Sequence, residues 1–255
     1  MDKLERVREN AVKIHGAREV DIHVMQCDMS DIEQAINLVP NALAVYGRID
    51  HLILNQAAAP MGPFLTMKSH HNPEFIERVF RINVFSNIQA SIAAIPELEK
   101  TGGHILVTSS GAGEVPFIIA GLYGSSKHAL NGFFYSLQQE LAAIKSNVTV
   151  SIAALGLIKT KEVGEISDHM TSFPEFLKGD LSECARLMID NFIVRSSTMS
   201  YPKFAMAQSR FMWWLKPIIG DVMLLDPDIY ENLVLLGERA KEMSKTTGYQ
   251  SGNLG

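Results

Sequence analysis

Segments with the hydrophobic pattern of buried strands alternate along the chain with segments that have the pattern of amphipathic helices. The pattern predicts strands at residues 20–27, 50–55, 104–110, 147–154 and 198–201. It predicts helical structure at residues 2–16, 31–46, 73–100 and 122–144, and a loop and helix region at 156–194. Strands that alternate with helices in this way indicate an α/β fold built on a parallel sheet.

Two neighbouring segments in the middle of the chain combine this pattern with reactive side chains. Residues 104–110, HILVTSS, are typical of a buried strand that ends in hydroxyl groups, and residues 125–144 are typical of an amphipathic helix. Tyr123 and Lys127 stand at positions i and i+4, which places both side chains on one face of a helix. Ser110 ends the strand thirteen positions before the tyrosine.

These three residue types suit proton transfer at a hydroxyl or carbonyl group. An ammonium beside a phenol stabilises the phenolate, so we expect Lys127 to lower the pKa of Tyr123 from its reference value of about 10. Such a tyrosine can exchange a proton with an alcohol or carbonyl, and Ser110 would hold the substrate oxygen. The alternative is a solvated helix pair, because Tyr-x-x-x-Lys alone is a common pattern. The order of strand, loop and helix favours the catalytic interpretation.

The chain resembles the short-chain dehydrogenase/reductase family, whose active site is a serine, a Tyr-x-x-x-Lys pair and an asparagine from an earlier helix. LILNQAA at residues 52–58 is similar to the family's fourth strand and its Asn-Asn-Ala-Gly signature, and FRINVFSN at residues 80–87 is similar to the helix that supplies the asparagine. The resemblance implies that Asn83 is this residue and holds a water in a proton relay. The alternative for Asn83 is an inward-facing amide bonded to local backbone.

One further segment narrows the resemblance. ALGLIKT at residues 154–160 is similar to the form that the 11-beta-hydroxysteroid dehydrogenase type 1 subgroup uses where most relatives have Pro-Gly. The resemblance implies a Rossmann-like, doubly wound parallel sheet and an oxidoreductase that uses NADP, with NAD as the alternative. It also implies that the enzyme interconverts a hydroxyl and a ketone on a bulky, apolar, steroid-like substrate.

The resemblance implies a set of cofactor-binding residues as well. They are Asp28, Met29, Asn55, Gln56, Ala57, Tyr123, Lys127, Ile158 and Thr160. Gln56 and Ala58 depart from the family's usual asparagine and glycine, and the methyl group of Ala58 is added where the backbone approaches the cofactor. A turn or helix cap is the alternative role for Asp28, and a cap of the following segment is the alternative for Thr160.

The beginning of the sequence differs from the family pattern, because no glycine-rich turn precedes Ile22. MDKLERVREN resembles the helix after the family's second strand, so the sheet is expected to lack the first β-α-β unit. In the strand order 3-2-1-4-5-6 this would separate strand 20–27 from the rest and leave strand 50–55 as an exposed edge. We hypothesise that the sequence is a truncated form, or an incomplete gene model, of a longer oxidoreductase.

Composition narrows the functional classes further. The 255 residues, 47% hydrophobic and 20% charged, suit one domain over 1–255, in which 203–255 would be a C-terminal substrate or dimer extension. A net charge of −5 without a basic stripe argues against a nucleic-acid partner. Cys27 and Cys184 are far apart, and the eight histidines lack ligand spacing, so neither a disulfide nor a metal site is predicted.

Two functional classes stay open at this point. The first is the oxidoreductase, which we expect to be a homodimer. Its apolar segment 210–225 would be a core or subunit contact. The alternative for this segment is a substrate lid or a peripheral membrane patch. The second is a catalytically silent truncated form or pseudoenzyme that acts through subunit association. As written the protein would be cytoplasmic, whereas an upstream anchor would place it at the endoplasmic reticulum membrane.

Overall fold

The computed structural model describes residues 2–16, 18, 21–62, 64–65, 68–116, 120–159 and 178–202. Thr160, the apolar segment 210–225 and the whole predicted C-terminal extension 203–255 lie outside the described residues. A substrate or dimer role for that extension stays a prediction.

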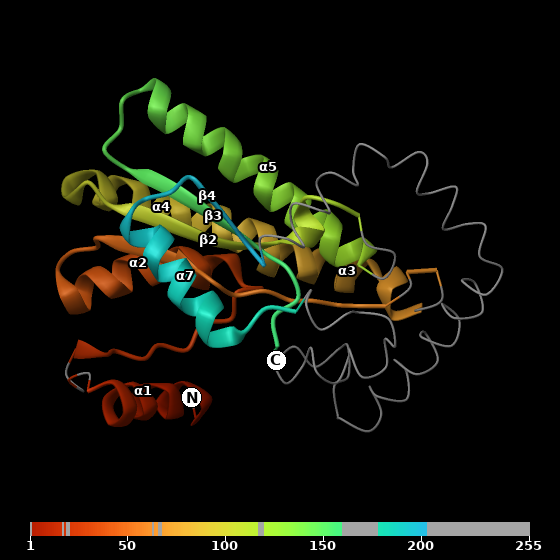
Figure 1. Ribbon diagram of the computed structural model, residues 1–255, viewed down its shortest axis with the longest axis horizontal. Coiled ribbons are helices and arrows are strands. Elements are labelled where there is room, and N and C mark those ends of the chain that lie inside the picture. Colours follow the sequence, from red (N-terminus) through yellow and green to blue (C-terminus); the bar gives the residue numbers. More distant parts are fainter. Residues whose placement is uncertain are drawn as a thin grey trace.

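Four parallel strands form the sheet at the centre of the described residues (Figure 1). In order across the sheet they are β1 (His51–Leu54), β2 (His104–Ser110), β3 (Thr149–Leu155) and β4 (Thr198–Tyr201). In β2 every residue is buried except Thr108 and Ser110, which are half-buried, as expected of a parallel strand covered on both faces. Four of the five predicted strands are therefore confirmed.

Helices cover both faces of this sheet (Figure 1). The helices of the described residues are α1 (Asp2–His15), α2 (Ile32–Tyr46), α3 (Pro73–Phe80), α4 (Ser86–Thr101), α5 (Gly121–Ala143) and α7 (Leu181–Ile193), with short helical turns η2 (Lys68–His71), η3 (Arg81–Phe85) and η4 (Gly111–Gly113). Ile105 and Val107 of β2 pack with α4 and α5, whereas Leu106 packs with α7. Because successive residues of a strand face opposite sides, α7 lies across the sheet from α4 and α5.

Two helix ends follow directly from local sequence. Asp31 precedes α2, and its carboxylate accepts the backbone N–H groups of Glu33 and Gln34, which are otherwise unpaired in the first turn. Gly47 ends α2 and Gly102 ends α4, both in the left-handed conformation with φ angles of 73° and 61°. Glycine adopts this conformation without a steric penalty from a side chain.

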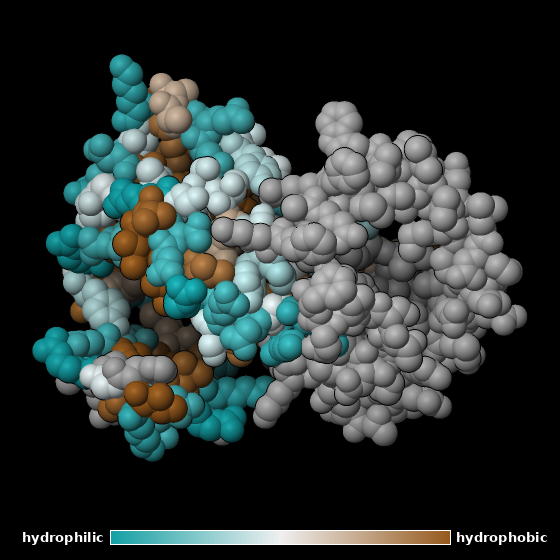
Figure 2. Space-filling model, in the orientation of Figure 1, coloured by the Kyte–Doolittle hydropathy of each residue, from teal (hydrophilic) through white to brown (hydrophobic). Residues whose placement is uncertain are grey.

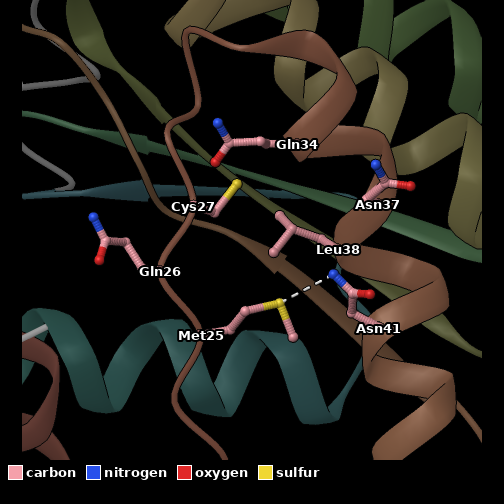
Figure 3. Close-up of a pocket in the computed structure, with 7 residues that line it drawn as sticks. All are labelled: Met25, Gln26, Cys27, Gln34, Asn37, Leu38 and Asn41. Atoms are coloured by element: carbon pink, nitrogen blue, oxygen red, sulfur yellow. Dashed lines mark hydrogen bonds between the residues drawn. The ribbon is translucent and has the colours of Figure 1, made fainter.

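The predicted strand at 20–27 is wrong, because residues 22–28 form no strand and are not part of the described sheet. A strand is stabilised by hydrogen bonds to a neighbouring strand, and no strand of the described sheet lies beside this segment. The segment instead faces α2 across a pocket of about 190 Å³ (Figure 3), where the Asn41 amide donates to Met25 Sδ at 3.5 Å. Within the described sheet β1 is an edge strand, as predicted for strand 50–55, and Ile53 is 56% exposed.

Exposed apolar side chains are found on α1 and α7, among other helices. Figure 2 shows apolar surface over α1 and α7, to which Val7 and Ile14 of α1 and Ile189 and Ile193 of α7 contribute. No helix within the described ranges is both long and apolar enough to cross a bilayer.

Candidate active site

The carboxyl ends of the parallel strands bring three predicted segments to one edge of the sheet. Residues 55–58 follow β1, Ser110 ends β2, and Ile158 follows β3. In open α/β sheets this edge is where ligands bind, because loops there are free to vary above a rigid scaffold. The candidate site is therefore built from the loops at this edge and from the helix α5 that follows β2.

The tight turn η4 carries the chain from β2 towards α5. The Ser110 hydroxyl accepts the backbone N–H of Ala112 at 3.1 Å, which caps the turn. Gly113 lies directly against α5: a β-carbon added there would stand 2.8 Å from Asn131 Nδ2 and 2.8 Å from the backbone oxygen of Lys127. This close approach holds the turn against α5, on which Tyr123 stands, and the Ser110 side chain acts to lower the pKa of the Tyr123 phenol.

Lys127 lies one turn after Tyr123 on α5, as its spacing predicts. The lysine is only 1% exposed, its ammonium donates to the backbone oxygen of Thr108 at 2.9 Å, and its nitrogen lies 5.8 Å from the centre of the Tyr123 ring. The structure thus brings Ser110, Tyr123 and Lys127 together at the end of β2.

The predicted direction of the Tyr123 pKa is wrong for this structure. Burial raises the pKa of Tyr123 above its ordinary value, and the hydrogen bond from Ser110 opposes this only in part. Burial also lowers the pKa of Lys127 to about 8. Removing either charged form from water costs free energy, and this cost is the largest influence on both pKa values. The phenol is therefore protonated at neutral pH and is available as a proton donor.

Asn83 sits in the π-helical turn η3 and is fully buried. Its side-chain oxygen accepts the N–H of Ala58 at 2.7 Å, and its amide nitrogen donates to the Ala58 oxygen at 2.7 Å and to Ser126 Oγ at 2.9 Å. Ser126 in turn donates to the backbone oxygen of Tyr123 at 2.7 Å. These contacts match the alternative of an inward amide bonded to backbone, and both amide protons are used.

Two residues of this network, Ser126 and Asn87, were not among the predicted site residues. Asn87 is 1% exposed, and its side-chain oxygen accepts the Gln56 amide at 2.9 Å. Ser126 immediately precedes Lys127, and Asn87 stands four positions after Asn83, so both positions were within motifs already recognised. Nothing in the residue pattern distinguishes a polar side chain that joins such a network from one on a solvated surface.

The structure also describes the positions of other predicted cofactor residues. Asp28 accepts both the N–H and the hydroxyl of Ser30 at 2.8 Å, and the backbone bond from Ser30 lowers the pKa of this carboxyl. Asp28 therefore has the turn role that was its alternative. Met29 lies within that turn, and Ile158 is buried and forms a bridge with Gly179. Asn55 and Ala57 are exposed at the sheet edge.

No cluster of three or more histidine, cysteine or acidic side chains suited to a metal ion occurs in the part of the chain that the structure describes. Both Cys27 and Cys184 have free thiols.

Sequence comparison identifies the family to which this arrangement belongs. A sequence profile of the family described as short chain dehydrogenase matches residues 1–171, which include every candidate catalytic residue. The chain belongs to the short-chain dehydrogenase family. The short-chain dehydrogenases are NAD(P)-dependent oxidoreductases, so the predicted family and enzyme class are confirmed.

Curated relatives narrow the family assignment. A hydroxysteroid 11-beta-dehydrogenase 1-like protein of Danio rerio is 33% identical over 208 residues, which cover 80% of this chain and 68% of the relative. The protein of that name from Gallus gallus is 31% identical over 211 residues, 82% of this chain and 67% of the relative. These similarities confirm the resemblance to the 11-beta-hydroxysteroid dehydrogenase type 1-like subgroup.

Solved structures confirm the fold. A short-chain dehydrogenase/reductase of Burkholderia phymatum in complex with NAD has a TM-score of 0.68 at 19% identity and covers 84% of this chain and 82% of its own. A short-chain dehydrogenase of Burkholderia cenocepacia J2315 in complex with NADP has a TM-score of 0.63 at 21% identity, covering 80% and 78%. The predicted Rossmann-like parallel sheet is therefore correct.

Proposed function

We propose that this short-chain dehydrogenase interconverts a hydroxyl and a ketone on a bulky, apolar, steroid-like substrate with NADP, or alternatively NAD, as cofactor. The observation that carries the proposal is the position of the buried Lys127 ammonium, which lies 5.8 Å from the centre of the Tyr123 ring and donates to the Thr108 oxygen of β2, the strand that Ser110 ends. Relatives named for 11-beta-hydroxysteroid dehydrogenase support the substrate class. Solved relatives in complex with NAD and NADP support the cofactor.

Each of the three side chains has a role that its surroundings permit. Tyr123 is the general acid in the ketone-reducing direction, because burial keeps its phenol protonated until a substrate oxygen becomes basic enough to accept the proton. Ser110 orients that oxygen through its hydroxyl. Lys127 is close enough to stabilise the phenolate that forms, since its positive charge lies 5.8 Å from the ring centre.

Asn83 enters the proposal with a narrower role than the sequence suggested. Both protons of its amide are donated to protein oxygens, one on Ala58 and one on Ser126. A water in a proton relay would therefore have to donate to an oxygen of Asn83 and could not accept from its amide. The side chain itself fixes the loop after β1 and, through Ser126, the first turn of α5.

The residues at the sheet edge fit a nicotinamide dinucleotide. Thr108 Oγ1 and Ser109 Oγ are buried without a hydrogen-bond partner among the described residues, and Lys127 Nζ has one acceptor for its three protons. Unpaired buried polar atoms at this edge suit a polar ligand that satisfies them. When bound, the dinucleotide supplies or takes up a hydride.

Individual residues would hold different parts of the dinucleotide. Asp28 and Met29 would hold its adenine, residues 55–57 its adenosine side, and Lys127 with Tyr123 its nicotinamide ribose. Ile158 and Thr160 would hold the carboxamide.

The proposal includes a homodimer. Phe85 of η3 and Ile92 of α4 are 46% and 52% exposed, and such aromatic and branched side chains are typical of the buried centre of a subunit interface. Sedimentation of the purified chain tests this part separately. A peripheral membrane contact through segment 210–225 stays a prediction, as does a place at the endoplasmic reticulum membrane through an upstream anchor.

One observation favours the second class of function, a silent form that acts by association. Strand β1 has no partner on its outer side within the described sheet, and an unpaired strand edge is a template for pairing with another chain. The two classes are separated by purified protein titrated with NADPH and NADH and then supplied with a panel of ketosteroids. Saturable binding and hydroxysteroid products support the enzyme. Binding of neither nucleotide, together with self-association, would support the silent form.

A further inference from the structure

The helical stretch that carries Asn83 is interrupted by a π-turn. Residues Arg81–Phe85 form this turn, in which the Ser86 N–H reaches back five positions to the Arg81 oxygen. A π-turn shifts the backbone hydrogen bonds out of the α-helical register and is often found at functional sites. Two neighbouring backbone oxygens here, those of Ile82 and Asn83, accept the side-chain amide nitrogen of Asn87 at 3.2 and 3.0 Å.

The other end of the same amide holds the loop after β1. Asn87 Oδ1 accepts the Gln56 amide at 2.9 Å, and Gln56 belongs to the loop 55–58 at the edge of the sheet. Two residues further on, the loop is bound by Asn83 through both the N–H and the oxygen of Ala58. The loop is therefore attached to η3 and α4 at two points, and Asn87 links one of them to the π-turn.

We propose that Asn87 is a positioning residue for the dinucleotide, acting through Gln56 on the loop 55–58. This inference rests on the proposed function, in which that loop holds the adenosine side of the cofactor. Asn87 is fully buried, and its hydrogen bonds join it to Ile82, Asn83, Gln56 and Ser91 and to none of Ser110, Tyr123 and Lys127. Its effect is thus on how the loop is placed and not on proton transfer.

An amide is required at this position because the two sides need opposite hydrogen-bonding groups. The backbone oxygens of the π-turn need a donor, and the Gln56 amide needs an acceptor. An aspartate would accept from Gln56 but would face two backbone oxygens with a negative charge. A leucine would leave the Gln56 amide unpaired, which is costly at a partly buried position.

The test compares nucleotide affinity in the full chain with Asn87→Asp, Asn87→Leu and the matched control Ser91→Ala. Ser91 is equally buried on α4 and donates to the backbone oxygen of Asn87 at 2.8 Å, but it has no hydrogen bond to the loop. The NADPH dissociation constant is measured by nicotinamide fluorescence, and the unfolding midpoint is measured without nucleotide. Both Asn87 variants are expected to weaken NADPH binding about tenfold, while Ser91→Ala lowers the midpoint but leaves affinity within about twofold of wild type.

A double variant gives an independent check on the path through Gln56. In the Asn87→Leu background, Gln56→Leu is expected to weaken NADPH binding by a smaller factor than it does in the wild type, because the contact between the two side chains is already lost. The pH profile of turnover is expected to stay that of the wild type in every Asn87 variant that turns over.

Three results would overturn the inference. Asn87 variants that bind NADPH as tightly as wild type would leave the proposed function standing but remove this role. Equal weakening by Ser91→Ala would show that any loosening of α4 has the same effect. A wild-type chain that binds neither NADPH nor NADH would overturn the inference together with the proposed function.

Discussion

The Lys127 ammonium donates to the backbone oxygen of Thr108 at 2.9 Å, while its nitrogen lies 5.8 Å from the ring centre of Tyr123. The lysine is thus fixed to strand β2 and can act on the tyrosine only through its charge. Burial raises the pKa of Tyr123 and lowers that of Lys127, so it shifts both residues towards their neutral forms. A phenolate at this site therefore depends on the pair and on what binds beside it.

Replacing Tyr123 with phenylalanine is expected to abolish ketone reduction. The variant keeps the buried ring and removes only the proton donor, so turnover should fall by about 10²- to 10⁴-fold. The NADPH dissociation constant should change little. Steroid product formation and nicotinamide fluorescence measure the two quantities, and Tyr46→Phe, on α2, is the matched control. Turnover retained in Tyr123→Phe would refute the assignment.

Lys127→Met is expected to make the protein more stable and to abolish its activity. The folded protein holds its lysine proton less tightly than the unfolded chain does, with a pKa of about 8 against an ordinary 10.5, so below pH 8 the buried charge destabilises the fold. Methionine at this position should raise the free energy of unfolding at pH 7 by about 1–2 kcal/mol and abolish turnover. The gain should shrink as the pH rises from 8 to 10.5. Urea unfolding across this range is the measurement, and a less stable variant at pH 7 would contradict it.

His104 is expected to make the protein sensitive to acid. The side chain is fully buried between β1 and β3, with Nδ1 hydrogen-bonded to Thr149 and Nε2 unpaired among the described residues. Burial lowers its pKa to about 4 from 6.5, so the unfolded chain binds the proton first as the pH falls. The resulting loss of stability begins near pH 6.5, is complete near pH 4 and amounts to about 1–3 kcal/mol.

The matching variant is His104→Asn, whose amide can still meet Thr149 but does not titrate. Its free energy of unfolding should depend less on pH between 6.5 and 4 than that of the wild type. The same dependence in both proteins would show that another group controls acid stability.

Two glycines of the active-site region give opposite expectations on substitution with alanine. A β-carbon at Gly113 would stand 2.8 Å from atoms of Asn131 and Lys127, so the turn after Ser110 would be displaced, at a cost of about 1–3 kcal/mol. A β-carbon at Gly132 meets nothing within 4 Å on the exposed side of α5, where alanine should stabilise the helix by up to about 1 kcal/mol. Urea unfolding of the two variants compares them. Equal effects would mean that the turn is not tightly packed on α5.

Much of the fold and the central residues could be predicted from the sequence because the signals were local. The apolar run of β2 and the Tyr123–Lys127 spacing on α5 each lie within one element, so periodicity alone places them. The direction of the Tyr123 pKa could not be predicted in this way. It depends on how far α5 is buried, which is a property of the packed molecule.

The strand predicted at 20–27 shows the same limit. Its residues have the composition of a strand, but a strand exists only where a neighbour accepts its hydrogen bonds, and none lies beside it in the described sheet. Asn87 was missed for a related reason. Its importance lies in joining Gln56 to the π-turn, and the turn itself leaves no mark in the sequence.

We propose above that Tyr123, Ser110 and Lys127 support transfer of a hydride between a nicotinamide and a steroid-like carbonyl. The most direct test supplies the purified chain with a ketosteroid and with NADPH that carries deuterium on the carbon that donates the hydride. Mass spectrometry then locates the label. We expect deuterium on the new carbinol carbon of the hydroxysteroid in wild type and its absence in Tyr123→Phe. Unlabelled substrate recovered from the wild type across a ketosteroid panel, although NADPH is bound, would contradict the claim.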